Sequence, residues 1–280
     1  MLSMDSKTFS RSQFLPPLLA GAAAGTAVDV SLFPLDTIKT RLQSENGFWK
    51  AGGFRNIYAG IGPTVLGSAP TAALFFCSYE STKVLLGKAS RKPASSRTLA
   101  THHMVAAMTG EVIACILRVP VENVKQKSQA SRERSSHIYR TILREENIRG
   151  LYRGYFSTVI REIPFSVIQF PLWEFLKSEV AIYQERPISP IYSAVCGSVA
   201  GAIAAAITTP LDVAKTRIML AKKGTISAGG NVPTVLGEIY RQTGVKGLFV
   251  GLGPRVLWIS IGGFVFLGVY EQVKAICLAS

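Results

Sequence analysis

A short pattern occurs three times along this chain of 280 residues: a proline, an acid two residues later, and a lysine three residues after the acid. The copies begin at Pro34, Pro120 and Pro210, at nearly even spacing. Self-similarity at a fixed period is typical of one structural unit built several times. The chain is therefore constrained to a fold of three similar units.

Two further phrases recur with the same period and in the same order. The first is an aromatic residue, any residue and a glycine, with copies at Tyr58-Ala59-Gly60, Tyr152-Arg153-Gly154 and Phe249-Val250-Gly251. The second is an aromatic residue, an acid, any two residues and a lysine, with copies that begin at Tyr79, Trp173 and Tyr270. We place the units at about 12–92, 93–186 and 187–280 of a single domain, 1–280.

The composition indicates a membrane protein with a basic surface. Hydrophobic residues make up 48% of the chain, its mean hydropathy is +0.27, and only 17% of its residues are charged, which is unusually apolar for a soluble domain. The formal net charge of +14 suggests nucleic acid, anionic lipid or an anionic ligand. No nucleic-acid-binding motif and no basic run with interleaved aromatics occurs. We therefore expect contact with anionic lipid and no nucleic-acid partner.

The sequence carries no pattern for an enzyme, a cofactor or a metal. The HExxH motif and the phosphate-binding loop are absent, and the adjacent His102 and His103 would point in different directions on a helix. The four cysteines are scattered through apolar stretches, as packing residues are. We expect neither catalytic residues nor a metal site.

Apolar segments long enough to cross a membrane occur twice in each unit. The first of each pair covers roughly 13–43, 100–130 and 190–221, and the second roughly 62–86, 155–180 and 253–278. Each first span holds a proline and charges near its end, and such groups are costly in a membrane unless they face protein or water. The pattern predicts an all-α membrane protein, with three pseudo-symmetric repeats of two transmembrane helices arranged as a six-helix barrel around a central cavity.

Three local features refine this prediction. Helical patterning around 137–147 and 231–243 predicts a short surface helix between the spans of a unit. The proline in each first span is expected to kink its helix. GxxxG phrases at 21–25 and 197–201 are expected to let helices approach closely, whereas unit two has Glu111 in place of the second glycine.

The repeated charges are placed to form two rings. An acid and a lysine three residues apart share a helix face, so converging helix ends can pair between neighbouring units. The first set comprises Asp36, Lys39, Glu122, Lys125, Asp212 and Lys215, with Gln43 and Gln129 as braces and Met219 at the third brace position. The second set comprises Glu80, Lys83, Glu174, Lys177, Glu271 and Lys274. The alternative is solvated helix-end pairs of about 0–1 kcal/mol each. One breakable ring at each mouth of a cavity would permit alternating access.

These phrases resemble those of the mitochondrial carrier family, whose members share a threefold proline-acid-basic signature, a glycine phrase and an aromatic-acid-basic phrase. The resemblance covers nearly the whole chain. It implies six tilted helices around a central cavity in the inner mitochondrial membrane, and the exchange of small solutes. It also implies that the first set of charges forms a matrix-side network and the second a cytoplasmic-side one.

Charges that break the threefold pattern are expected to select the solute, because a ligand is rarely threefold symmetric. Asp29 and Glu111 face the same way as the acids of their own units and have no counterparts in the others. Arg161 and Glu162 lie about half-way along the fourth span, and an arginine-acid pair at this place resembles that of carriers for amino-acid-like solutes. Charged residues at membrane depth are candidates for function. The alternative for the two unpaired acids is an internal salt bridge, for instance to Arg118.

Within the family, the phrases around these charges resemble those of members that carry S-adenosylmethionine. Arg161 suits the carboxylate of such a solute, and the three acids suit its ammonium and sulfonium groups. Trp258 and Phe75 are candidates to stack on its adenine, and Gly67, the counterpart of Arg161 in unit one, completes the candidate binding set. We expect exchange of S-adenosylmethionine for S-adenosylhomocysteine by a monomer in contact with membrane lipid, with cardiolipin as one candidate. A carrier for another cationic amino-acid-like or nucleotide solute, and a non-transporting receptor or lipid-binding module on the same scaffold, are the alternatives.

Overall fold

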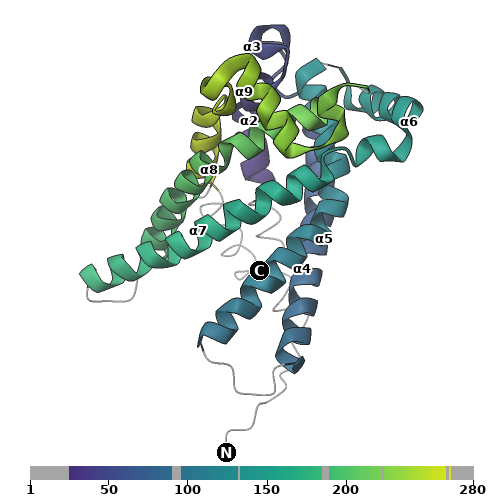
Figure 1. The fold of residues 1–280 in the computed structure, drawn as a ribbon. Coiled ribbons are helices and arrows are strands. Elements are labelled where there is room, and N and C mark those ends of the chain that lie inside the picture. Colours follow the sequence, from purple (N-terminus) through teal and green to yellow (C-terminus); the bar gives the residue numbers. More distant parts are fainter. Residues whose placement is uncertain are drawn as a thin grey trace, which may run out of the picture.

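The computed structural model describes residues 25–89, 96–131, 133–184, 189–221, 224–262 and 265. Every regular element within these ranges is helical (Figure 1), which confirms the predicted all-α class. Residues Glu271 and Lys274, and the greater part of the sixth predicted span, lie outside the described residues.

Four long helices coincide with the predicted spans. They are α4 (Ile61–Ala89), α5 (Ser96–Ser131), α7 (Tyr155–Gln184) and α8 (Pro190–Leu220). The first span is described from residue 25 and ends with α2 (Phe33–Gln43). The sixth span begins with the helical segment Leu252–Gly262.

Not all of these helices are apolar enough to pass as membrane spans by length and hydropathy alone. Within the described ranges, three do: Ile61–Lys88, Met104–Ser131 and Ile191–Leu220. A fourth candidate is the pair Val232–Leu248 and Leu252–Gly262, which meet at an angle of 54°. Helix α7 is 30 residues long but carries Arg161 and Glu162 as its seventh and eighth residues, nearer its start than the half-way position expected from the sequence. The charges that lower its hydropathy are the ones expected to face a cavity.

Three short helices lie together at one end of the bundle (Figure 1): α3 (Gly47–Lys50), α6 (Ser135–Leu151) and α9 (Val232–Leu248). Helices α6 and α9 confirm the surface helices predicted around 137–147 and 231–243. A 3₁₀ turn, η1 (Ile226–Gly229), precedes α9. Each surface helix is anchored by one apolar face, since buried side chains of α9 pack on those of α8 and buried side chains of α6 pack on α5.

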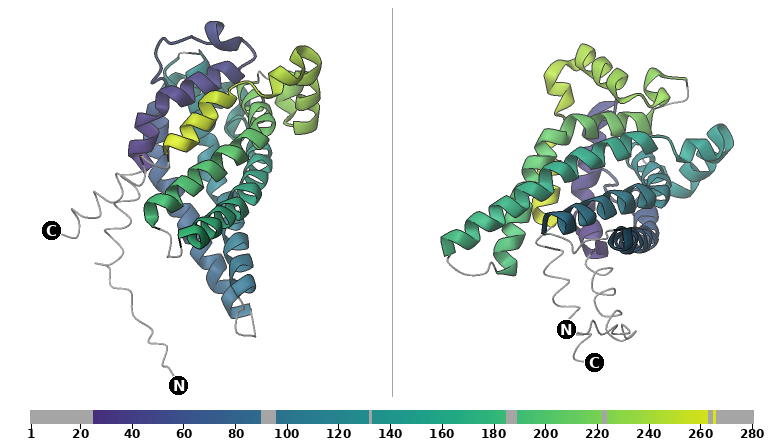
Figure 2. Two further views of the ribbon diagram at one scale, coloured as in Figure 1. Left: turned by 90° about the vertical axis from the view of Figure 1, so that its left-hand side faces the viewer. Right: turned by 60° about the horizontal axis from the view of Figure 1, so that its bottom comes forward.

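The long helices are paired across unit boundaries. Helix α4 of unit one packs along α5 of unit two, and α7 of unit two packs along α8 of unit three. Figures 1 and 2 show these two pairs spreading apart from the end of the bundle where α2 lies. At that end α2, α5 and α8, the ends of the three first spans, contact one another. This order of neighbours is the one expected for units arranged around an axis.

The prolines of the first spans do not act alike. In unit one the helix is interrupted at Leu32, just before Pro34, and α2 starts anew at Phe33. Helices α5 and α8 run through Pro120 and Pro210 as single helices. The helix is therefore interrupted next to the proline in unit one, and in units two and three the prolines are contained within continuous helices.

The glycines of the aromatic-x-Gly phrase allow close contacts between neighbouring units at the end where α2, α5 and α8 converge. A Cβ at Gly60 would lie 2.9 Å from the backbone oxygen of Lys125, and a Cβ at Gly154 would lie 2.8 Å from Cγ of Met219. A Cβ at Gly251 would lie 3.2 Å from Gln43. Unit one thus contacts unit two, unit two contacts unit three, and unit three contacts unit one through equivalent glycines. The contacts explain why only glycine suits these three positions, where φ is also positive.

We expect Gly60→Ala to destabilise the protein by about 1–3 kcal/mol, because the new Cβ meets backbone and φ is +90°. Gly62→Ala is the matched control, since nothing lies within 4 Å of its Cβ position and alanine favours helix. Thermal unfolding in detergent can be followed with a thiol-reactive dye in a Cys77→Ser background, because Cys115 and Cys196 are buried whereas Cys77 is exposed. Equal melting temperatures for the two variants would contradict the close contact.

Candidate functional site

The first set of repeated charges forms three ion pairs where α2, α5 and α8 converge. Lys39 lies 2.8 Å from Asp212, Lys125 lies 2.7 Å from Asp36, and Lys215 lies 2.6 Å from Glu122. Each lysine reaches the acid of a different unit, so the pairs run around the bundle in one direction. We call these six residues the gate network.

Two glutamines support this network, and a third residue differs. Nε2 of Gln43 donates to Asp212 at 2.9 Å, and Nε2 of Gln129 donates to Asp36 at 3.1 Å. The equivalent residue of unit three, Met219, is fully buried in an apolar cluster with Cys115 and Val119. The third pair instead receives a hydrogen bond from Gln126, whose Nε2 lies 3.0 Å from Oε1 of Glu122. Gln126 was not among the predicted residues, although its place one turn after an acid was a usable signal.

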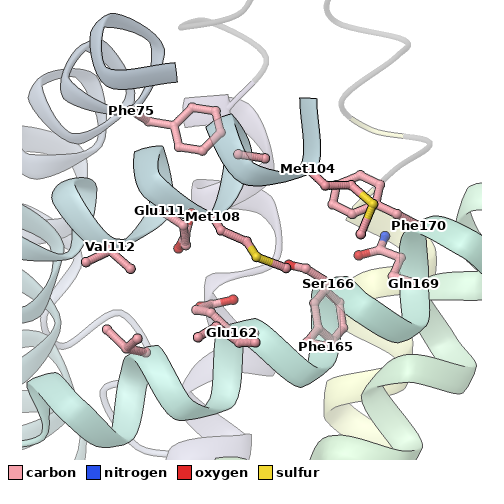
Figure 3. Close-up of a pocket in the computed structure, with 13 residues that line it drawn as sticks. Phe75, Met104, Met108, Glu111, Val112, Glu162, Phe165, Ser166, Gln169 and Phe170 are labelled. Carbon is pink, nitrogen blue, oxygen red and sulfur yellow. The ribbon is translucent and has the colours of Figure 1, made fainter. Parts of the chain in front are cut away.

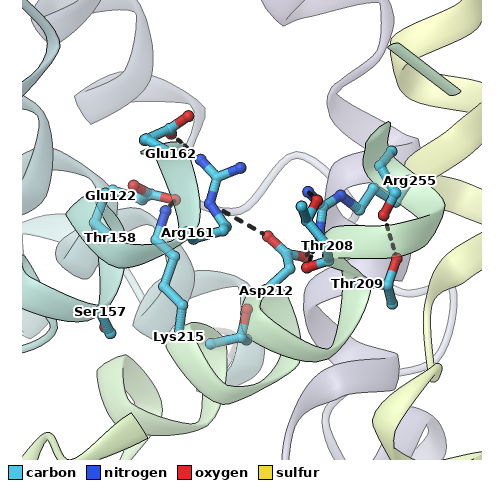
Figure 4. A network of polar contacts seen from close by, with 12 residues as sticks. Glu122, Ser157, Thr158, Arg161, Glu162, Thr208, Thr209, Asp212, Lys215 and Arg255 are labelled. Atoms are coloured by element: carbon cyan, nitrogen blue, oxygen red, sulfur yellow. Dashed lines mark hydrogen bonds and ion pairs between the residues drawn. The ribbon is translucent and has the colours of Figure 1, made fainter. Parts of the chain in front are cut away.

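Asp212 is the centre of the network (Figure 4). Besides Lys39, it lies 3.5 Å from Arg255 and 3.8 Å from Arg161, and its side chain is 3% exposed. Arg255 is fixed by two hydrogen bonds to Thr208, at 3.1 Å to its backbone oxygen and 2.8 Å to its hydroxyl. Three cations therefore share one buried carboxylate in unit three, whereas Asp36 pairs with one lysine. The repeats alone gave no sign of this asymmetry.

A chain of charges leads from Asp212 into the middle of the bundle. Arg161 pairs with the neighbouring Glu162, Glu162 lies 3.7 Å from Arg118, and Arg118 pairs with Glu111. The internal salt bridge that was the alternative for Glu111 is therefore present, and the expectation of an unpaired acid there was wrong. The sequence spacing allowed this pair, because Glu111 and Arg118 lie two turns apart on α5.

A cavity of about 510 Å³ lies directly above the gate network. The six residues of the gate network form its floor. Its walls come from α4, from α7, from the part of the first span that precedes α2, and from the sixth span. Five predicted binding residues line it: Asp29, Gly67, Arg161, Glu162 and Trp258. Volumes of this size are usual for small-molecule sites.

Asp29 differs from the other acids of this cavity. It is half-buried, and within the described part of the chain neither an ion pair nor a side-chain hydrogen bond joins it to another residue. Gly67 has a packing role as well, since a Cβ there would lie 2.7 Å from Val121 on α5. Arg118 and Arg255 also line the cavity.

The predicted binding residues do not all lie in one space. Phe75 and Glu111 line a second, apolar pocket between α4, α5 and α7, which shares Glu162 and Phe165 with the central cavity (Figure 3). This pocket was not predicted, because methionine and phenylalanine in a span give the same pattern whether they face lipid, protein or a ligand.

The second set of repeated charges is only partly described. Glu174 and Lys177 pair at 2.8 Å within α7, and Glu174 is 64% exposed. This pair does not join two units, so the expected ring is not formed at this position. Nζ of Lys83 lies 5.4 Å from the ring centre of Tyr79 and Nζ of Lys177 lies 4.1 Å from that of Trp173. The side chain of Glu80, and both Glu271 and Lys274, lie outside the described residues.

A bundle of membrane helices that encloses a polar cavity, with ion pairs between repeats closing one end of it, is the architecture of a solute transporter. The model of the family described as mitochondrial carrier protein matches residues 10–90, 96–183 and 186–279. The chain therefore belongs to the mitochondrial carrier family, and is a multi-pass protein of the inner mitochondrial membrane.

Individual relatives are similar over nearly the whole chain. The protein named mitochondrial S-adenosylmethionine carrier protein from Xenopus laevis is 56% identical over 95% of this chain and 98% of its own length. The protein of the same name from Mus musculus is 54% identical over 98% of this chain and 97% of its own. The S-adenosylmethionine mitochondrial carrier protein homolog of Drosophila melanogaster is 49% identical over 95% of this chain and 94% of its own.

Proposed function

We propose that this protein exchanges S-adenosylmethionine for S-adenosylhomocysteine across the inner mitochondrial membrane by alternating access. The observation that carries the proposal is the asymmetric set of charges in the central cavity, with Asp29 on one wall and the Arg161–Glu162 pair on another. A solute with a carboxylate, an ammonium and a sulfonium matches both signs of charge. The names of the similar proteins support the same solute.

The proposed roles follow from position. Arg161 takes the carboxylate, because a guanidinium can bind a carboxylate with two parallel hydrogen bonds. Asp29 takes a cationic group of the solute, since it is the acid of the cavity that has no protein partner among the described residues. Glu111 acts with Arg118 to position the neighbouring Glu162 and belongs to the wall of the site.

The gate network is proposed as the matrix-side gate. Its ion pairs join different units, so they must separate if the units move apart and the cavity opens at that end. The cytoplasmic-side gate is proposed to comprise Glu80, Lys83, Glu174, Lys177, Glu271 and Lys274, which would pair between units when that end closes. Differential binding of the solute to the two states then drives the exchange.

The same proposal includes a monomer that catalyses no chemical reaction and needs no cofactor. Three units within one chain complete the ring of the gate network, so a second copy adds nothing to the cavity. The basic excess of the chain favours an anionic lipid such as cardiolipin around it.

Reconstituted liposomes test this function. We expect vesicles loaded with S-adenosylhomocysteine to take up labelled S-adenosylmethionine, and empty vesicles to take up far less. The double variant Glu111→Ala, Arg161→Ala should reduce uptake to background. Uptake by the wild type that does not exceed this variant contradicts the proposal. A panel of lysine, arginine, ATP and ADP as internal solutes separates the alternative carriers, since stronger exchange with any of these would replace the proposed substrate.

A further inference from the structure

A pocket of about 150 Å³ opens beside the central cavity, between α4, α5 and α7. Figure 3 shows the side chains of Phe75, Met104, Met108 and Phe165 directed toward it from three helices. Glu162 and Phe165 line both spaces, so the pocket is continuous with the central cavity. An apolar cavity of this volume accommodates about one aromatic ring in other proteins. The opening into the central cavity leaves room for the rest of a larger ligand.

The charges at the rim of this pocket are already balanced. Glu111 pairs with Arg118, and Glu162 lies against both Arg118 and Arg161. Two acids and two arginines leave no net charge there, so the rim gives no preference for a cation. The acid without a protein partner in the described chain, Asp29, lines the central cavity and not this pocket. A neutral, flat group therefore suits the pocket better than the sulfonium or the ammonium does.

Two polar side chains and a rigid aromatic residue complete the pocket. Ser166 and Gln169 lie one turn apart on α7 and line it, and no hydrogen bond between either side chain and another described residue is present. Both can meet the polar edge of a heterocycle. Phe75 is held in place by Gly110, since a Cβ at that glycine would lie 3.3 Å from the phenylalanine ring. The pocket therefore offers aromatic faces, polarizable methionine sulfurs and hydrogen-bonding groups.

We propose that this pocket binds the adenine of the solute, while its amino-acid part lies in the central cavity between Arg161 and Asp29. The inference rests on the proposed function for the identity of the solute. It places the base between α5 and α7, the two spans of unit two, and α4 of unit one, and makes Phe75, Met108 and Gln169 residues that select for a purine. It leaves Trp258, which lines the central cavity and not this pocket, outside the base-binding site.

Filling the pocket tests the inference. Ala107→Phe places a ring in the space proposed for the base, and Val105→Phe, on the same helix but exposed and outside the pocket, is the matched control. We expect Ala107→Phe to raise the KM for S-adenosylmethionine on the order of tenfold or more, as loss of base stacking does. Inhibition by S-methylmethionine, which has the same sulfonium and amino acid without adenosine, should not change. The control should resemble the wild type.

A binding measurement separates this inference from the proposed function. Adenosine should raise the melting temperature of the detergent-solubilised wild type and of Val105→Phe, but not that of Ala107→Phe. The milder variant Gln169→Leu, which keeps side-chain volume, should weaken both the adenosine shift and the competition by S-adenosylhomocysteine. Uptake of S-adenosylmethionine by Ala107→Phe with an unchanged KM overturns the adenine site and leaves the function intact. The opposite outcome is a wild type that takes up no S-adenosylmethionine but whose melting temperature rises with adenosine, while that of Ala107→Phe does not. This outcome overturns the function and leaves the adenine site intact.

Discussion

Replacing Asp212 by asparagine is expected to be the most damaging single change in the gate network. Its carboxylate is 3% exposed and is shared by Lys39, Arg255 and Arg161, at 2.8, 3.5 and 3.8 Å. Removing one partner from a buried ionic cluster costs about 3–5 kcal/mol, because the remaining charges stay buried and repel one another. We therefore expect Asp212→Asn to lower the melting temperature by several degrees and to cut exchange to less than about a tenth of the wild-type rate.

Glu133→Gln is the control for this change. Glu133 also has a close side-chain partner, Nδ1 of His137 at 2.7 Å, but its side chain is 49% exposed. Exposed pairs contribute about 0–1 kcal/mol, so stability and transport should remain near the wild-type values. A melting temperature of Asp212→Asn that equals that of Glu133→Gln would show that Asp212 does not hold the network together.

Replacing Asp29 by asparagine is expected to weaken solute binding without lowering the stability of the protein. Asp29 lines the cavity without an ion pair to any described residue, so its loss leaves no protein cation unpaired and the melting temperature should not fall. Its contact with a cationic solute is charge-assisted and contributes about 1.5–3 kcal/mol. The KM for S-adenosylmethionine should therefore rise by roughly tenfold to a hundredfold.

The two solutes identify which cation Asp29 meets. S-adenosylhomocysteine keeps the ammonium but has a neutral sulfur. If Asp29 binds the sulfonium, Asp29→Asn should leave competition by S-adenosylhomocysteine nearly unchanged; if it binds the ammonium, both solutes should weaken together. An Asp29→Asn protein with a wild-type KM for S-adenosylmethionine would remove Asp29 from the binding site.

The spans and the gate network could be predicted because they repeat. Three copies of one phrase at even spacing require equivalent positions, and equivalent helix ends around an axis meet. Pairing between acids and lysines of neighbouring units follows from this symmetry without knowledge of any side-chain geometry. The structure then gives the direction, in which Lys125 pairs with Asp36. The same argument predicted a cross-unit pair for Glu174, but Glu174 pairs with Lys177 of its own helix. The reason is that helices α4 and α5 diverge from helices α7 and α8 with distance from α2, so the units are apart at this end (Figures 1 and 2).

Features that belong to one unit only were less accessible to sequence analysis. The approach of Arg161 and Arg255 to Asp212 brings residues of α7 and the sixth span to α8, and no local pattern indicates such a contact. The apolar pocket depends on the distance between α5 and α7, which composition does not determine. Glu111 was placed in the right region of the bundle, but its pairing with Arg118 was only one of two alternatives.

The substitution at the third brace position distinguishes the three seams between units. Gln43 donates a hydrogen bond from unit one to Asp212 of unit three, and Gln129 donates one from unit two to Asp36 of unit one. Because hydrogen bonds are directional, each of them fixes the position of one helix end relative to the other. At the seam between units two and three, Met219 packs against Cys115, Val119 and Gly154 instead. A thioether chain keeps such contacts while its neighbours slide. At the closed end, two of the three boundaries between units are therefore held by glutamine hydrogen bonds, and the third by apolar packing of Met219 at the same position. A shift of the units at this third boundary breaks no glutamine hydrogen bond.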